Sequence, residues 1–188
     1  MNSTEVEMKK LYQALLLIAA GLLICTVNIY INFGKITVNV TPTWLGYLLL
    51  FFGLQKLDSR RYRWLPYYVL ILAAGDIFSW IIGFTGFTFN GSYLEIVLSV
   101  LYVVFVCCLM SAVIDVARSL KSENVSKLKI VRLILMLTGI ISTALIVLAA
   151  LDERFAFVYM LNGVIGLIAY AVSVAVLYMF YKEMKERE

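Results

Sequence analysis

The carboxylate of Asp76 lies deep inside a long apolar stretch, residues 65–87, of this 188-residue chain. If that stretch is a transmembrane helix, an ionised carboxylate near its middle costs at least about 2.5 kcal/mol. No Lys or Arg lies at a matching depth in another apolar stretch. We therefore expect Asp76 to be protonated, paired or hydrated, and to bind a proton, a cation or a cationic part of a ligand. The alternative is a protonated Asp76 that hydrogen-bonds to a neighbour such as Asn28 or Ser79.

Four further polar side chains belong to the same half of the expected bundle. Asn28 and Asn32 are four residues apart, so on a helix they share one face. Glu95 and Asn162 lie near the outer ends of two later apolar stretches. Together with Asp76 they predict an outward-facing polar cavity that binds a small molecule or a cation. In the alternative interpretation the asparagines only join helices, through hydrogen bonds worth about 0.6–2 kcal/mol each.

Several kinds of chemistry are excluded by composition. The chain has no histidine, which rules out H-E-x-x-H metalloprotease and Ser-His-Asp mechanisms. It has no G-x-x-x-x-G-K-[ST] or G-x-G-x-x-G loop for nucleotide phosphates. Cys25, Cys107 and Cys108 lie within apolar stretches and are interpreted as small packing residues. We expect no enzyme, no cofactor and no metal site.

The elements that must position these side chains are membrane helices. The chain is 63% hydrophobic and 15% charged, whereas soluble domains are about half apolar and about a quarter charged. Several apolar stretches exceed the roughly 18 residues that indicate a transmembrane helix. The sequence predicts an all-α, polytopic transmembrane bundle that forms a single integral membrane domain, 1–188. Its six helices are expected at about 11–33, 42–57, 65–87, 93–117, 130–151 and 155–181.

The segment 42–57 is the shortest of the six and decides the topology. Thr41 and Pro42 are typical of a helix start. Sixteen residues reach about 24 Å, short of a roughly 30 Å bilayer core, although Lys56 can extend its amine toward the interface. We expect a short helix that is sheltered by its neighbours or thins the bilayer. The alternative is five helices plus a re-entrant segment.

Sidedness follows from the basic residues. With six helices, all Lys and Arg except Lys35 and Arg154 lie on the side of the two termini. The five-helix alternative places Lys9, Lys10 and Arg154 outside, so the charge rule barely separates the two topologies. We expect a multi-pass plasma membrane protein with cytoplasmic N- and C-termini. The basic clusters match loops beside anionic lipid, so no nucleic-acid partner is expected.

The stretch "PTWLGYLLLFFGLQKL" carries a family resemblance. It resembles a segment P-D-x-I-G-Y-x-L-I…G-L-x-x-L of small polytopic membrane proteins of Gram-positive bacteria. The matching residues are Pro42, Gly46, Tyr47, Gly53, Leu54 and Leu57. Thr43 stands where that family often has Asp, which leaves this chain without an acidic group there. The resemblance implies a bacterial plasma membrane and no particular activity.

Two classes of function fit these residues. The first is a transporter or a membrane-embedded subunit that binds a small molecule or cation, with Asp76, Asn28, Asn32, Glu95 and Asn162 around the ligand. Six short-looped helices are similar in overall size to the substrate-capture subunits of energy-coupling-factor transporters, and a partner subunit or a second copy of the chain would then supply what this chain lacks. The second class is a structural or regulatory membrane protein without a ligand, whose polar residues serve helix packing.

Overall fold

The structure is a computed structural model that describes residues 3–26, 30–33, 36–39, 43–57, 59–85, 91–151 and 156–186. These residues form six α-helices, one β-hairpin and one short 3-10 turn. The elements are α1 (Ser3–Thr26), β1 (Tyr30–Phe33), β2 (Ile36–Asn39), α2 (Thr43–Leu57), η1 (Arg60–Tyr62), α3 (Leu65–Thr85), α4 (Gly91–Ser119), α5 (Val125–Leu151) and α6 (Ala156–Glu186). The prediction of a six-helix bundle is confirmed.

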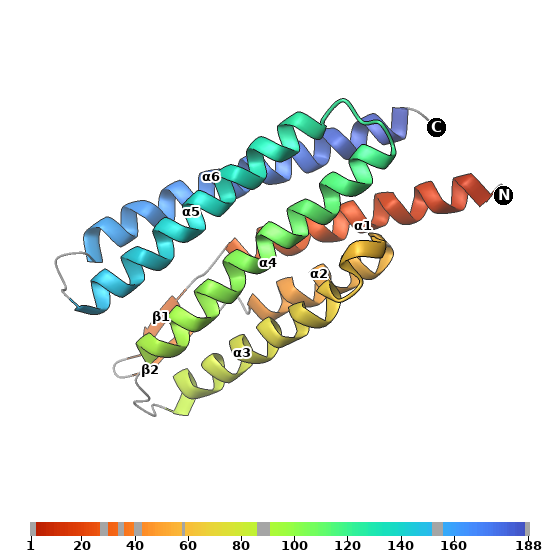
Figure 1. Cartoon of the computed structure of the whole chain (residues 1–188). Coiled ribbons are helices and arrows are strands. Elements are labelled where there is room, and N and C mark those ends of the chain that lie inside the picture. The colour runs from red at the N-terminus through yellow and green to blue at the C-terminus, as the bar shows by residue number, and fades with distance from the viewer. Residues whose placement is uncertain are drawn as a thin grey trace.

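The helices run up and down and close into a ring. Each one packs against the helix before and the helix after it in the sequence, and α6 packs against α1. Both ends of the chain lie at one end of the bundle, and the hairpin lies at the other (Figure 1). This arrangement brings residues far apart in the sequence, such as those of α1 and α6, into direct contact.

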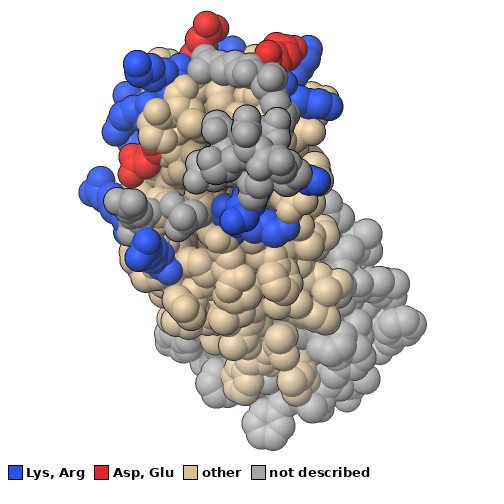
Figure 2. Space-filling model, turned by 90° about the vertical axis from the view of Figure 1, so that its right-hand side faces the viewer, with Lys and Arg blue, Asp and Glu red and all other residues tan. Residues whose placement is uncertain are grey.

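One end of the bundle is basic, and we refer to it as the basic end. All Lys and Arg residues whose side chains are described belong to it, namely Lys9, Lys10, Lys56, Arg61, Arg63, Arg118, Lys121, Lys127, Lys129, Arg132, Lys182 and Lys185. Figure 2 views the molecule from the side of this end, and the blue side chains gather in the upper half of the picture. Uncharged residues cover much of the remaining described surface in that view.

The first helix differs from the expected span of 11–33. It begins at Ser3 and ends at Thr26, and the antiparallel hairpin follows, with Tyr30 opposite Asn39 and Phe33 opposite Ile36. The physical reason is that β-branched and aromatic residues dominate this segment, with two residues between the strands, one of them glycine. The length of the apolar run concealed a change from helix to strand.

Four stretches of the described helices are long and apolar enough to span a membrane, in α1, α4, α5 and α6. Helix α3 has 21 residues, and α2 has only 15. Helix α2 lies between α1 and α3 and buries seven of its residues, among them Leu50 and Leu54. Its neighbours therefore shelter the short helix. Thr41 and Pro42, the expected helix start, lie outside the described residues.

The packed core lies toward the basic end. In α5 the described buried side chains end at Leu135, and in α6 they begin at Ala169. Away from the basic end, apolar side chains of both helices are open to the surroundings, with Ile140 52% and Ile165 58% exposed. Apolar exposure on this scale is what lipid tails cover in an integral membrane protein.

Candidate functional site

Glycines hold α1 and α2 in close backbone contact. A Cβ on Gly46 would lie 2.6 Å from Sγ of Cys25 and 2.8 Å from the carbonyl oxygen of Gly21. One on Gly53 would lie 2.9 Å from Cγ1 of Ile18. Small residues permit such an approach, as they do at membrane helix interfaces in general. This packing fixes the end of α1 beside the beginning of α2.

Asp76 lies on α3 beside that beginning. The backbone N–H of Trp44, the second residue of α2, donates a hydrogen bond to the Asp76 carboxylate. The first N–H groups of a helix lack intrahelical acceptors and carry partial positive charge. Asp76 therefore caps α2 from another helix, which explains how a short helix begins inside the bundle. This backbone partner differs from Asn28 and Ser79, the side-chain partners considered from the sequence.

A cavity of about 260 Å³ lies between α1, α4, α5 and α6, away from the basic end. Its polar lining is made mainly of hydroxyl groups, and no charged residue is among its described lining residues. The described lining consists of Cys25, Thr26, Ser99, Tyr102, Val103, Leu135, Thr138, Gly139, Ser142, Ile146, Gly163, Gly166, Leu167 and Tyr170. Cys25 also donates a weak hydrogen bond to the carbonyl of Thr43, 3.8 Å away, so the cavity adjoins the capped start of α2.

Tyr102 is the exceptional residue of this lining. Its ring is held between Tyr47 and Tyr170, with centroids 6.2 and 6.3 Å away. Its hydroxyl is buried and has no hydrogen-bond partner among the described residues. The Tyr170 side chain is its candidate partner and interacts with it in the manner of a weak hydrogen bond, but the pair does not meet the geometric criteria of a full one. A buried polar group without a partner costs about 1–3 kcal/mol, so this hydroxyl calls for an explanation.

Other tyrosines of the bundle do have partners. The Tyr68 hydroxyl of α3 donates to the carbonyl of Leu101 on α4 at 3.0 Å. The Tyr12 hydroxyl of α1 donates to the carbonyl of Met184 on α6 at 2.9 Å. These hydroxyls join helices through backbone acceptors. Tyr102 has the same functional group in a similar apolar setting and makes no such bond.

Of the five residues predicted to surround a ligand, the structure describes the side chain of Asp76 and not those of the other four. Asp76 is half-buried at the start of α2 and is not among the described residues that line the cavity. Asn28 lies outside the described residues, as do the side chains of Asn32, Glu95 and Asn162. The backbone of Asn32 belongs to strand β1. The expectation that it shares a helix face with Asn28 is therefore wrong, because Asn32 belongs to a strand and not to a helix.

Sequence reasoning missed the hydroxyl groups of the cavity. Ser99 and Tyr102 are three residues apart on α4, and Thr138 and Ser142 are four apart on α5. Such spacings place both members of a pair on one helix face. Polar residues repeated at helical spacing on two adjacent membrane helices were the signal that could have revealed the cavity.

A second polar cluster lies at the basic end. Glu183 of α6 accepts hydrogen bonds from the Ser122 hydroxyl, the Glu123 backbone N–H at 2.9 Å and the Asn124 side-chain amide at 2.8 Å. These three donors form the turn between α4 and α5. Lys121 of the same turn has φ of 51° and ends α4 with Ser122 N–H bonded to the Ala117 carbonyl at 2.9 Å. Glu183 therefore clamps α6 to the α4–α5 turn.

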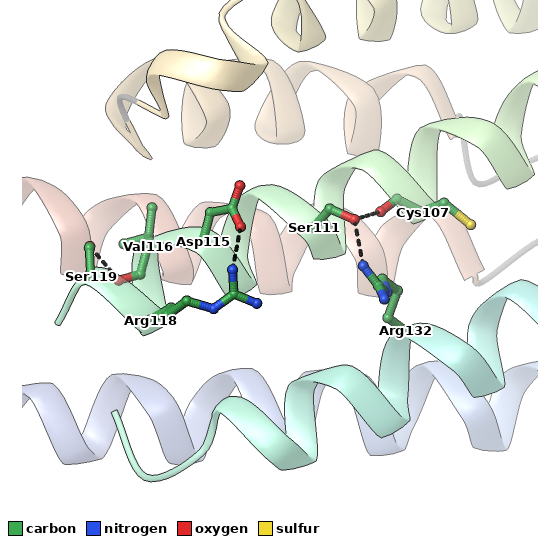
Figure 3. A network of polar contacts seen from close by, with 7 residues as sticks. All are labelled: Cys107, Ser111, Asp115, Val116, Arg118, Ser119 and Arg132. Atoms are coloured by element: carbon green, nitrogen blue, oxygen red, sulfur yellow. Dashed lines mark hydrogen bonds and ion pairs between the residues drawn. The ribbon is translucent and has the colours of Figure 1, made fainter. Parts of the chain in front are cut away.

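A network on the facing surfaces of α4 and α5 continues this polar region (Figure 3). Arg118 pairs with Asp115 one turn away on α4, at 3.6 Å. Arg132 of α5 donates to the Ser111 hydroxyl at 3.1 Å, and Ser111 in turn donates to the Cys107 carbonyl at 2.7 Å. The groups are accessible to solvent, so each contact is worth little on its own. The contact between Arg132 and Ser111 is the one of these that joins the two helices at the basic end.

The two polar regions differ in what they can do. The cluster around Glu183 is internally matched and suits a structural role. The cavity presents hydroxyl groups and tyrosine rings, which can hydrogen-bond and surround a small uncharged or cationic molecule. Among the described residues, no group of three or more His, Cys, Asp or Glu could hold a metal ion.

Comparison with known proteins adds no functional analogue. No protein-family model matches the chain, and neither a curated protein nor a solved structure is similar to it.

Proposed function

We propose that this integral membrane protein is a membrane-embedded binding subunit that takes a small, uncharged or singly cationic polar molecule into the cavity between α1, α4, α5 and α6. The observation that carries the proposal is the buried Tyr102 hydroxyl without a hydrogen-bond partner among the described residues, on a side chain that lines a hydroxyl-rich cavity. A ligand with an acceptor group would satisfy it after a rotation of the Tyr102 side chain that turns the hydroxyl toward the cavity. The unpaired hydroxyl destabilises the free protein, and it would be retained because it forms a hydrogen bond with the ligand.

The size and lining of the cavity limit the ligand class. Its volume of about 260 Å³ is just below the roughly 300 Å³ at which ligand pockets usually begin, which favours a molecule of few non-hydrogen atoms. An anion would find no cationic side chain among the described lining residues. A cation would gain from the ring faces of Tyr102 and Tyr170, at about 0.5–2 kcal/mol for a desolvated contact.

The setting of the site supports a place in the membrane of a cell with an anionic cytoplasmic leaflet. The described Lys and Arg residues gather at one end, as expected for a cytoplasmic face under the positive-inside rule. The two chain ends would then be cytoplasmic, and the cavity would lie in the opposite half of the bilayer. A bacterial plasma membrane, and a transport role in which a partner subunit supplies the energy, belong to this proposal.

The experiment is a thermal-unfolding screen of the purified protein in detergent. Its panel contains small amines such as choline and ethanolamine, neutral polyols and amides, and matched carboxylates as anionic controls. We expect a saturable rise of the unfolding midpoint with a neutral or cationic member, and its loss in Tyr102→Phe. The control Tyr178→Phe removes a hydroxyl from a tyrosine that is 61% exposed and lies outside the cavity lining, and it should keep the rise.

A third variant separates the two ligand classes. Asn also caps helices, so Asp76→Asn should remain folded while losing the carboxylate beside the cavity. The rise should shrink in this variant if the ligand is a cation and stay unchanged if it is neutral. Binding of carboxylates alone, or equal ligand shifts in wild type and Tyr102→Phe, would contradict the proposal.

A further inference from the structure

A second hollow lies at the basic end, separate from the hydroxyl-lined cavity. It has a volume of about 740 Å³ and lies between the beginning of α1 and the ends of α2 and α4. We call it the lysine groove. Its described lining consists of Met8, Lys10, Leu11, Gln13, Gln55, Lys56, Leu57, Val116, Ser119 and Leu120. None of these belongs to the lining of the hydroxyl-lined cavity.

The polar part of the groove is cationic. Lys10 and Lys56 contribute two ammonium groups, and no Asp or Glu is among the described lining residues. The Lys56 amine donates to the side-chain oxygen of Gln13 at 2.7 Å, which holds it across the gap between α1 and α2. The ion pairs formed among described side chains, Arg118 with Asp115 and Lys182 with Glu186, involve neither groove lysine. Among the described side chains, therefore, no acidic group neutralises the positive charge of the groove.

The remainder of the groove is apolar. Five of its lining side chains are aliphatic or thioether groups, contributed by α1, α2 and α4. Each lysine carries its ammonium group on a long alkyl chain. The alkyl chain can cover apolar surface while the charged group reaches the level of the lipid headgroups. A groove with cationic and amide donors above an apolar wall matches a molecule that joins a phosphate to a hydrocarbon portion.

We propose that the lysine groove binds the phosphate headgroup of an anionic lipid, with the proximal part of the lipid against its apolar wall. A phosphate can be supplied by a lipid or by a soluble molecule. The apolar share of the lining and the position at the basic end, where the positive-inside rule places the cytoplasmic headgroups, favour the lipid. The site is independent of the ligand proposed for the hydroxyl-lined cavity.

The test uses the purified full chain in a neutral detergent, titrated with dioctanoyl phosphatidylglycerol while the unfolding midpoint is measured. We expect a saturable rise for the wild type, and half-saturation at about thirtyfold higher lipid in Lys10→Gln/Lys56→Gln. The matched control is Lys127→Gln/Lys129→Gln, which removes the same charge from two exposed lysines at the same end and outside the groove. Its titration should match that of the wild type.

Two further arms identify the source of the phosphate. Dioctanoyl phosphatidylcholine, which has the same chains and no net charge, should give no saturable rise, and neither should inorganic phosphate at equal concentration. A rise with inorganic phosphate would overturn the lipid assignment, and equal weakening in the control pair would overturn the groove. Glutamine is as good a helix former as lysine. If the double variant nevertheless fails to fold, Lys56→Gln alone carries the test, with Lys127→Gln as its control.

Discussion

Glycines on the two sides of the bundle meet opposite surroundings. On the α1–α2 side, a Cβ on Gly46 would collide with Sγ of Cys25 and the Gly21 carbonyl. On the α5–α6 side, a Cβ on Gly163 would meet no atom within 4 Å. The first glycine exists because two backbones touch. The second borders the cavity, where space has been left.

The difference teaches how a small membrane bundle separates support from binding. The α1–α2 pair, with α2 capped by Asp76, is closely packed along its glycines and borders the lysine groove at the basic end. The α4–α6 side is clamped by Glu183 at the basic end and leaves its hydroxyl-lined cavity away from it. A bundle that was loosely packed throughout would be unstable. The Glu183 clamp and the close-packed α1–α2 pair therefore stabilise the bundle around the cavity.

The largest effect is expected from a leucine at the two glycine positions. Gly46→Leu forces the backbones of α1 and α2 apart, and we expect the free energy of unfolding to fall by more than about 3 kcal/mol, with loss of folded protein. Gly163→Leu should remain folded, because its side chain has space and leucine is the better helix former. Folded yield and the unfolding midpoint in detergent give the comparison. Equal loss at both positions would contradict it.

A smaller effect is expected at the clamp. Glu183→Ala removes the acceptor of three hydrogen bonds from the α4–α5 turn, and we expect unfolding free energy to fall by about 2–3 kcal/mol, since charged acceptors make the stronger bonds. Glu186→Ala, three residues on, loses only an exposed pair with Lys182 at 3.5 Å, worth about 0.5 kcal/mol or less. Chemical or thermal unfolding of both variants measures the difference. A loss at Glu183 as small as that at Glu186 would show that the turn holds without the clamp.

Much of the architecture could be predicted from the sequence because it depends on local composition. The apolar lengths gave six helices, and α2 lies within one residue of the expected 42–57. The hairpin was hidden because an apolar strand and an apolar helix look alike by length, although the glycine between two short runs of β-branched and aromatic residues indicated a turn.

The contacts of the polar residues could not be predicted in the same way. The partner of Asp76 is a backbone N–H of another helix, and a backbone donor leaves no mark in a sequence. The donors bonded to Glu183 lie about 60 positions earlier, in a turn that looks like an ordinary hydrophilic loop. Tyr102 was overlooked because the absence of a partner is a property of the packed bundle. As candidate ligand-binding residues, the sequence suggested charged and amide side chains, whereas the cavity in the structure is lined by neutral hydroxyl groups.

The central claim is that the Tyr102 hydroxyl is kept for a ligand and not for the fold, and the ligand-free stability of Tyr102→Phe tests it most directly. The substitution keeps the ring contacts and removes a buried group without a partner, so we predict an unfolding free energy about 1 kcal/mol or more above the wild type. Tyr68→Phe loses its hydrogen bond to the Leu101 carbonyl, so its free energy of unfolding should instead be about 1 kcal/mol below that of the wild type. A loss of stability in Tyr102→Phe equal to that in Tyr68→Phe would show that the hydroxyl already serves the fold, and would contradict the account.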